Sequence, residues 1–320
     1  MGRLRAGEYT GARWRGEHRQ GEPGEACEGE DFAVLKMTTD PILTSLSYSG
    51  GEQSHGLLEM VLRGHIERPK NFVVIGANPG MEDERSQEIV EGARARCHEA
   101  KIPFVTAKGR DLYTDLLMLP FIGQTRMDNP PYWVKKPNGK IGRLKQKCTG
   151  AYKIAPLNRA RRILLNELCG ISLVTTRIPK VDVWIGFAAD ESGRISEKKT
   201  SKGPKYLNLR YPLVERGITK AKMIGYYLDH NIPRPPRSVC VACFSNGLRY
   251  FEDMYYNRPN DWAKAVLVDD SIRDLSQIGI KGQVFVSSTC IPLRDLPAMN
   301  FRQGAADYIE HRCNSGVCFI

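Results

Sequence analysis

Apolar runs alternate with amphipathic stretches in the first third of the chain, and this alternation predicts strands that alternate with helices. Residues 42–48 form an apolar run that ends in Ser-Gly-Gly, and residues 56–62 continue with apolar positions at helical spacing. The run NFVVIGA at 71–77 has the composition of a buried parallel strand. A long helical pattern with acidic residues at its start covers 82–100, and a third strand is predicted at 102–107. This order predicts an α/β fold class, a parallel Rossmann-like sheet with helices on both faces.

The pattern is less regular further along the chain. Residues 181–188 predict another strand, residues 218–230 a helix, and IPRPPR at 232–237 a rigid turn. The N-terminal stretch is rich in Gly, Arg and Glu and has no helical or strand period, which predicts a disordered tail; a start codon assigned too far upstream would explain it. We therefore predict a tail at 1–36, an α/β domain at 37–255 with a basic insert at 131–166, and a smaller cysteine-containing α/β extension at 256–320.

The composition is that of a globular protein with an excess of positive charge. The chain has 320 residues, of which 41% are hydrophobic and 26% charged, and its formal net charge is +11. No apolar run approaches the roughly 20 residues that cross a bilayer, and the basic N-terminus lacks the apolar core of a signal peptide. We predict a cytoplasmic protein without a membrane partner, in which the nine cysteines are reduced thiols, metal ligands or redox groups. The charge favours an anionic partner.

A candidate phosphate-binding loop follows the first predicted strand. Residues 49–54 read SGGEQS, between a strand and the start of a helix. Gly50 and Gly51 let the backbone approach a ligand closely, and Ser49 and Ser54 add hydroxyl donors to the amides of the helix start. An ordinary glycine-rich turn is the alternative. The position after the first strand of an α/β sheet favours ligand binding.

A series of segments, in order, resembles motifs of the PP-loop ATP pyrophosphatases and phosphoadenosine phosphosulfate (PAPS) reductases, which share the adenine nucleotide alpha hydrolase-type fold. The loop resembles S-G-G-K-D-S, and ANPGME at 77–82 resembles A-D-T-G-x-E. CTGAYKIAPL at 148–157 is similar to C-x-x-x-x-K-x-x-P-L, and GFAADESGR at 186–194 to G-x-R-x-x-E-S-x-x-R. YPLVE, IT and CVAC complete the series between 211 and 243.

The resemblance implies that ATP binds at the loop together with Mg²⁺. Glu52 and Gln53 stand where the family has Lys and Asp, Asn78 replaces an acid, and Phe187 replaces an Arg. These departures leave open a degenerate site that binds nucleotide without hydrolysing it. The predicted nucleotide-binding residues are Ser49, Gly50, Gly51, Gln53, Ser54, Asn78 and Gly80.

Candidate catalytic residues follow the predicted strand at 181–188. Glu191 and Arg194 lie where the carboxyl end of a strand faces the ligand crevice, and the guanidinium of Arg194 suits a phosphate or sulfate. A solvated loop pair is the alternative. The resemblance adds Lys153 as a third catalytic candidate. His55, within the loop, is a further candidate phosphate contact or acid.

Three cysteines are candidate ligands of one centre. Cys240 and Cys243 form a C-x-x-C motif, and Cys148 lies in the family-like segment. Thiolates at this spacing can share a metal or cluster or form a redox pair, and two buried structural cysteines are the alternative. We favour a [4Fe–4S] cluster over zinc, and the resemblance to thiolating enzymes suggests that an open iron would carry sulfide. Candidate fourth ligands are Cys290, Cys313 and Cys318.

The segment 131–166 contains ten Lys or Arg and no acid, interleaved with Tyr132, Trp133 and Tyr152. Cations for phosphates and flat rings for stacking are what a nucleic-acid groove needs, whereas a solvated face is the alternative. The candidate nucleic-acid contacts are Lys140, Arg143, Lys145, Lys147 and Arg159.

The leading hypothesis is an enzyme that adenylates an oxygen of its substrate with ATP, releasing pyrophosphate, so that sulfur can replace that oxygen. The substrate would be DNA or tRNA, and a sulfur-donor protein would be a further partner. The alternative is a true PAPS reductase, although residues 310–318 (EHRCNSGVC) do not match the family's E-C-G-x-H. A third hypothesis is a nucleic-acid-binding module with a degenerate nucleotide site.

Overall fold

A computed structural model describes residues 41–119, 121, 127–175, 177–192, 195, 204–235 and 240–301. By its internal contacts the chain divides into two units, Met1–Leu35 and Lys36–Ile320. The first unit, and with it the predicted tail, lies outside the described residues. All of the following concerns the second unit.

Buried strands of the second unit form a parallel sheet. Its five described strands are β1 (Thr44–Tyr48), β2 (Phe72–Ala77), β3 (Phe104–Ala107), β6 (Val181–Ile185) and β7 (Leu207–Arg210). They are all parallel, in the order β3-β2-β1-β6-β7. The order reverses between β1 and β6, and in such sheets ligands bind in the crevice at the carboxyl ends of the strands that flank the reversal.

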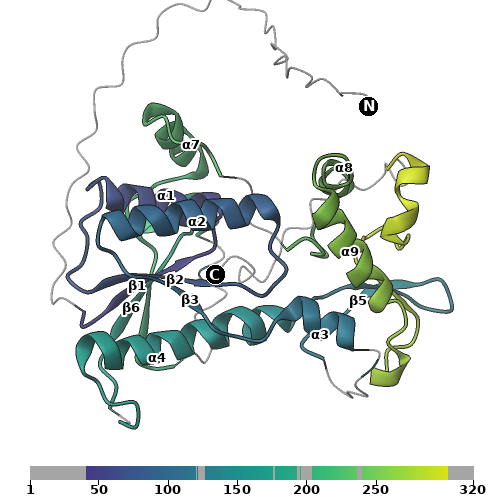
Figure 1. Ribbon diagram of the computed structural model, residues 1–320, viewed down its shortest axis with the longest axis horizontal. Coiled ribbons are helices and arrows are strands. Elements are labelled where there is room, and N and C mark those ends of the chain that lie inside the picture. Colours follow the sequence, from purple (N-terminus) through teal and green to yellow (C-terminus); the bar gives the residue numbers. More distant parts are fainter. Residues whose placement is uncertain are drawn as a thin grey trace, which may run out of the picture. The chain divides into compact units, whose positions relative to one another are not determined.

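Helices cover both faces of this sheet (Figure 1). On one face, α1 (Glu52–Leu62), α2 (Glu84–Glu99) and α7 (Lys220–Asp229) share a core with β1 and β2. On the other face, α4 (Ala155–Cys169) packs its apolar positions against Val73 and Ile75 of β2, and Ala107 of β3 and Val181 of β6 join the same core. The predicted α/β fold class is confirmed. No helix in the described part of the chain combines the length and the apolar character needed to cross a membrane.

The helix α4 was not predicted, because its residues were assigned to a basic insert. Arg161 of α4 lies in the core and donates hydrogen bonds to the hydroxyls of Ser45 (2.9 Å) and Ser47 (2.6 Å) on β1. Burial lowers the pKa of Arg161 to about 10, while Tyr206 acts in the opposite direction. Arg161 therefore anchors α4 to the sheet and is not part of an exposed basic surface.

A second core lies beside the sheet. The antiparallel strands β4 (Trp133–Lys135), β5 (Ile141–Arg143) and β8 (Gln283–Phe285), in the order β5-β4-β8, share it with the helices α3 (Leu112–Met118), α8 (Leu248–Asn257) and α9 (Pro259–Ser271). The second core therefore contains residues of the predicted insert at 131–166. It also contains residues on both sides of position 255, the predicted boundary between the α/β domain and the C-terminal extension. The remaining short elements are η1 (Gly150–Ile154), η2 (Ala189–Glu191), α6 (Pro212–Glu215), η3 (Ser276–Ile278), η4 (Leu293–Asp295) and η5 (Pro297–Met299).

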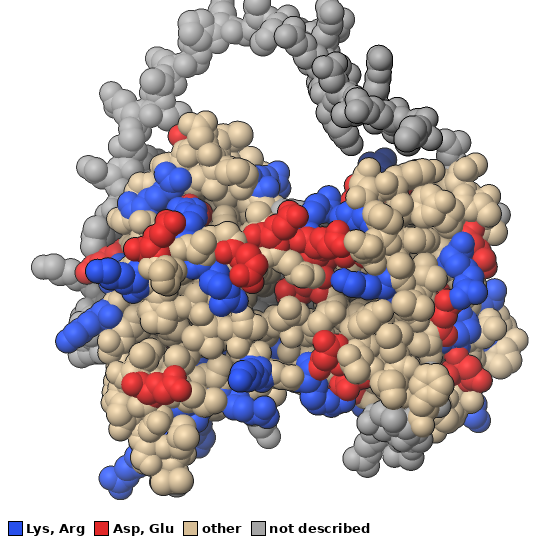
Figure 2. Space-filling model, in the orientation of Figure 1, with Lys and Arg blue, Asp and Glu red and all other residues tan. Residues whose placement is uncertain are grey.

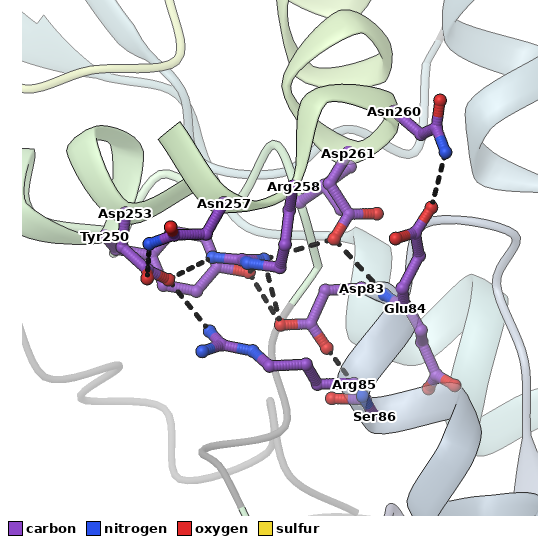
Figure 3. Close-up of polar contacts among 12 residues, drawn as sticks. Asp83, Glu84, Arg85, Ser86, Tyr250, Asp253, Asn257, Arg258, Asn260 and Asp261 are labelled. Atoms are coloured by element: carbon purple, nitrogen blue, oxygen red, sulfur yellow. Dashed lines mark hydrogen bonds and ion pairs between the residues drawn. The ribbon is translucent and has the colours of Figure 1, made fainter. Parts of the chain in front are cut away.

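A buried ion network connects the two cores (Figure 3). Arg258, whose side chain is 5% exposed, lies 3.4 Å from a carboxylate oxygen of Asp83 and 3.1 Å from one of Asp261. Asp83 also accepts hydrogen bonds from the Ser86 amide at the start of α2 and from the Tyr250 hydroxyl on α8. One guanidinium thus ties the N-terminus of α2 to the junction of α8 and α9.

We predict that Arg258→Ala lowers the free energy of unfolding by about 3–5 kcal/mol, because two buried carboxylates lose their cation. The matched control is Arg85→Ala: Arg85 is only partly buried, with a side chain that is 43% exposed, and pairs with Asp253 at the edge of the same network. The control should lose less than about 1 kcal/mol. Urea titrations compare the two variants, and equal losses would contradict a structural role for the buried pairs.

Candidate functional site

The predicted phosphate loop joins β1 to α1 at the point where the strand order reverses. Gly50 has a φ of 72°, in the left-handed region that favours glycine, and a β-carbon there would lie 3.1 Å from a methyl group of Val90 and 3.3 Å from the Ser86 carbonyl oxygen. Gly51 is the N-cap of α1 and offers no side chain to its first amides. The glycines therefore bring the backbone close to α2 and leave the start of α1 without a side-chain cap.

The two serines of the loop hold it closed. The Ser54 hydroxyl donates to the Gly51 carbonyl oxygen (3.1 Å) and accepts a hydrogen bond from the Ser49 amide (3.3 Å). The hydroxyls of Ser49 and Ser54 are 3.3 Å apart. Gln53 precedes Ser54 in the first turn of α1, and its side chain is half-buried.

Gly186 directly follows β6 and packs against the phosphate loop at the start of α1. A β-carbon on Gly186 would lie 2.8 Å from the Ser54 amide nitrogen and 2.9 Å from the Gln53 carbonyl carbon, so no larger residue fits without displacing the first turn of α1. Gly186 was not among the predicted site residues. Its sequence signal was its position as the first residue of the family-like segment at 186–194, but only the packing shows what it contacts.

The end of the neighbouring strand β2 forms a tight turn. The Asn78 side chain accepts a hydrogen bond from the Gly80 amide (2.7 Å). Gly80 has a φ of 77°, and a β-carbon there would overlap the carboxylate of Asp111. Asn78 is exposed beside the phosphate loop, since β2 pairs directly with β1.

The three candidate catalytic residues are not assembled in one place. Glu191 follows β6 and forms an ion pair with the Lys220 ammonium (3.1 Å), and it accepts a bond from the Ala188 amide (3.4 Å). Lys153 instead lines the cavity that contains the candidate cysteine ligands. Arg194 lies outside the described residues.

A cavity of about 40 Å³ contains all three candidate cysteine ligands, Cys148, Cys240 and Cys243, in its wall. Cys148 precedes η1, while Cys240 and Cys243 bracket a turn closed by a hydrogen bond between their backbones (3.1 Å). Cys240 also forms a β-bridge with Glu82, just after the turn at the end of β2. This thiol cavity and the phosphate loop are therefore attached to the same short segment.

Among the described residues that line the thiol cavity, Lys153 is the one cation. Burial raises the pKa of Cys148, and it raises that of Cys240 to about 12 although the Lys153 ammonium opposes this. Burial alone would lower the pKa of Lys153, but Cys240 and Glu82 outweigh it and the pKa is raised. Lys153 therefore remains charged, and the cavity favours an anionic occupant.

A buried hydroxyl lies near the same thiols. Tyr132 is fully buried in the second core, against which all three cysteines pack. Burial raises its pKa, and the electrostatic influence of Cys148, Cys243 and Cys240 raises it further. Within the described residues the Tyr132 hydroxyl has no hydrogen-bond partner, which is costly for a buried group, and Tyr132 does not line the thiol cavity.

The cysteines suit a soft metal in chemistry and in location. Thiolates are ligands for iron–sulfur clusters and zinc. As placed, however, the described side chains include no group of three or more His, Cys, Asp or Glu that could hold a metal ion. Cys290 is buried and is not part of the cavity wall, and Cys313 and Cys318 lie outside the described residues.

The basic segment divides into exposed and internal cations. Lys140, Arg143, Lys145 and Lys147 are exposed on the β4–β5 hairpin and the stretch that leads to Cys148. The Arg143 guanidinium lies 5.4 Å from the ring centroids of both Trp133 and Phe244, and Phe244 also lines the thiol cavity.

The other cations of the segment have different positions. Arg159 is exposed on α4, whereas Arg162 of the same helix donates to the carbonyl oxygens of Ser172, Leu173 and Thr175. Basic and acidic side chains are intermingled on the face shown in Figure 2. The segment is therefore not one continuous basic surface, and its exposed cations are fewer than the sequence suggests.

His55 faces the core. One ring nitrogen lies 2.7 Å from the Tyr48 hydroxyl, and the other lies 3.6 Å from the buried carboxylate of Glu59. Burial lowers the pKa of His55. The ring of this histidine thus belongs to the packing between α1 and β1.

Neither a protein-family model nor a curated protein matches this chain. Among solved structures, the chain is similar to the U34-tRNA thiolase NcsA from Methanococcus maripaludis, solved with its [4Fe–4S] cluster. The identity is 16%, the likeness covers 76% of this chain and 75% of that chain, and the TM-score is 0.37.

Proposed function

We propose that this chain is an enzyme of the PP-loop ATP pyrophosphatase type, related to the PAPS reductases. It binds ATP and adenylates an oxygen of a nucleic-acid substrate, which prepares that position for sulfur transfer. The observation that carries the proposal is the attachment of a phosphate-type loop and a three-thiol cavity to one segment, residues 76–83. Nucleotide activation and sulfur chemistry would then occur side by side.

The loop would act on the triphosphate. The substrate oxygen attacks the α-phosphorus of ATP, the bond from that phosphorus to the bridging oxygen breaks, and pyrophosphate leaves. Backbone amides at the start of α1 would stabilise the charge that develops on pyrophosphate. Mg²⁺ prefers oxygen ligands, and Gln53 and Asn78 offer amide oxygens where the family has carboxylates. Most Mg²⁺ contacts would therefore come from phosphate and water.

The thiol cavity would supply the sulfur step. When bound, a [4Fe–4S] cluster on Cys148, Cys240 and Cys243 would leave one coordination position for a sulfur ligand. The Lys153 ammonium would attract an anionic sulfur species to the cavity.

The exposed hairpin cations would hold the substrate backbone. Lys140, Arg143, Lys145 and Lys147 lie on the stretch that leads into the thiol cavity at Cys148. Phosphate contacts from such side chains position a nucleic acid without reading its sequence. The base to be modified would be selected by other groups, and a cytoplasmic location suits a tRNA or DNA substrate.

For the nucleotide site, we predict that Gly186→Ala weakens ATP binding at least about tenfold, because the new methyl group displaces the first turn of α1 and each 1.4 kcal/mol is a factor of ten. Gly92→Ala in α2 is the control, since a β-carbon at Gly92 contacts nothing within 4 Å. Calorimetric titration with ATP measures the affinity, and a pyrophosphate-release assay with and without tRNA measures the chemistry. Unchanged ATP affinity in folded Gly186→Ala would count against the loop. ATP binding without pyrophosphate release would favour the degenerate site.

For the thiol cavity, anaerobically purified protein should be brown and contain iron. Each of Cys148→Ser, Cys240→Ser and Cys243→Ser should remove the visible absorbance. Cys169→Ser is the control, because Cys169 lies at the end of α4 and bonds to the Ile42 carbonyl oxygen. Iron and zinc analysis completes the experiment, and colourless protein with neither metal would rule the cluster out.

For the substrate, we predict that replacing Lys140, Arg143, Lys145 and Lys147 together with Gln weakens binding to DNA and tRNA and flattens its salt dependence. Each lost phosphate contact lowers the slope of log K against log salt by about 0.7–0.9. The control replaces four other exposed cations of matched type, namely Arg68, Lys70, Lys101 and Lys180. Gel-shift titrations at several salt concentrations measure both. Absence of binding at low salt would defeat the nucleic-acid proposal and favour a reductase that acts on a sulfonucleotide.

A further inference from the structure

The phosphate loop carries an acid where a phosphate site needs positive charge. Glu52 is the first residue of α1, next to the amides that would face the triphosphate. Its side chain is only 14% exposed. An uncompensated carboxylate in this position would repel the phosphates of a nucleotide through a poorly screened field.

An arginine from a distant part of the sequence neutralises this acid. The Nε group of Arg234, in the segment that follows α7, donates a hydrogen bond to the Glu52 carboxylate at 2.5 Å. The same turn of α1 is fixed to α7, because the Tyr227 hydroxyl donates to the Glu52 carbonyl oxygen at 2.6 Å. A backbone bond from the Ile232 amide to the Tyr227 carbonyl oxygen (2.9 Å) then directs the chain toward Arg234.

Arg234 retains unused donors. The Arg234 side chain is 55% exposed, and within the described ranges the structure gives no partner to its two terminal nitrogens, Nη1 and Nη2. A guanidinium that is held at Nε presents these nitrogens as a planar pair. That geometry matches two oxygens of one phosphate group or of adjacent ones.

We propose that Arg234 is a phosphate-binding residue of the nucleotide site and that Glu52 is its anchor. This inference rests on the proposed function and extends it, because it names the cation that the loop itself lacks. Glu52 fixes the Nε side of the guanidinium, and the Nη groups donate to oxygens of the triphosphate. The acid in the loop is then a positioning residue for the arginine.

The test is a calorimetric titration of the full chain with ATP and with adenosine. Arg234→Gln should weaken ATP binding about 10- to 100-fold, because two charge-assisted hydrogen bonds to phosphate are lost, and should leave adenosine affinity unchanged. The control is Arg294→Gln, since Arg294 has a similar side-chain exposure (60%) and pairs with Asp270 in the second core. Adding Glu52→Lys to Arg234→Gln should restore part of the ATP affinity, because the loop then carries its own cation.

Two results would overturn the inference while leaving the proposed function intact. In the first, wild-type protein binds ATP, and neither Arg234→Gln nor Arg294→Gln changes the affinity. The ion pair between Arg234 and Glu52 would then be a surface contact only. The other is an equal loss of ATP and adenosine binding in Arg234→Gln, which would indicate general damage to the pocket. A folded wild-type protein that binds no ATP at all would instead overturn the proposed function, and this inference with it.

Discussion

The buried ion network around Arg258 is the constraint on which the arrangement of both candidate sites depends. A charge removed from water is costly, and here one guanidinium lies among Asp83, Asp261 and the more exposed Asp253. Within the described part of the chain, Arg258 Nε and Asp261 Oδ1 have no hydrogen-bond partner. Burial also raises the pKa of Asp261. Such a network contributes little net stability compared with an apolar core, and we infer that its main role is to hold the connected segments in place.

What the network positions is the segment that ends β2. Gly76 lies against the Tyr48 carbonyl oxygen on β1, and Pro79 and Met81 line the thiol cavity. Glu82 bridges to Cys240, and Asp83 enters the ion network. Residues 76–83 thus run from the end of β2, which pairs with β1, to the thiol cavity and then to the second core.

The sequence predicted the parts of the structure that depend on local pattern. Short buried strands and a Gly-Gly turn are encoded by neighbouring residues, so β1, β2 and the loop at Gly50 followed from the apolar runs. The boundaries of the second core did not, because it is assembled from segments on both sides of the sheet strands β6 and β7. The role of Gly186 and the pairing of Glu52 with Arg234 were also out of reach, since both depend on residues more than 130 positions apart in the chain.

The basic segment at 131–166 shows most clearly that the role of a charged residue depends on its position in the fold. In the sequence, ten cations without an acid indicated one basic surface. In the structure, Arg161 binds two serine hydroxyls in the core, and Lys153 is half-buried among thiols. Both were counted with the solvent-facing cations because burial is not visible in a charge run. Seven of the ten cations remain exposed, namely Lys135, Lys136, Lys140, Arg143, Lys145, Lys147 and Arg159. The charge run therefore overstated the basic surface by the three cations that are buried or half-buried, Lys153, Arg161 and Arg162.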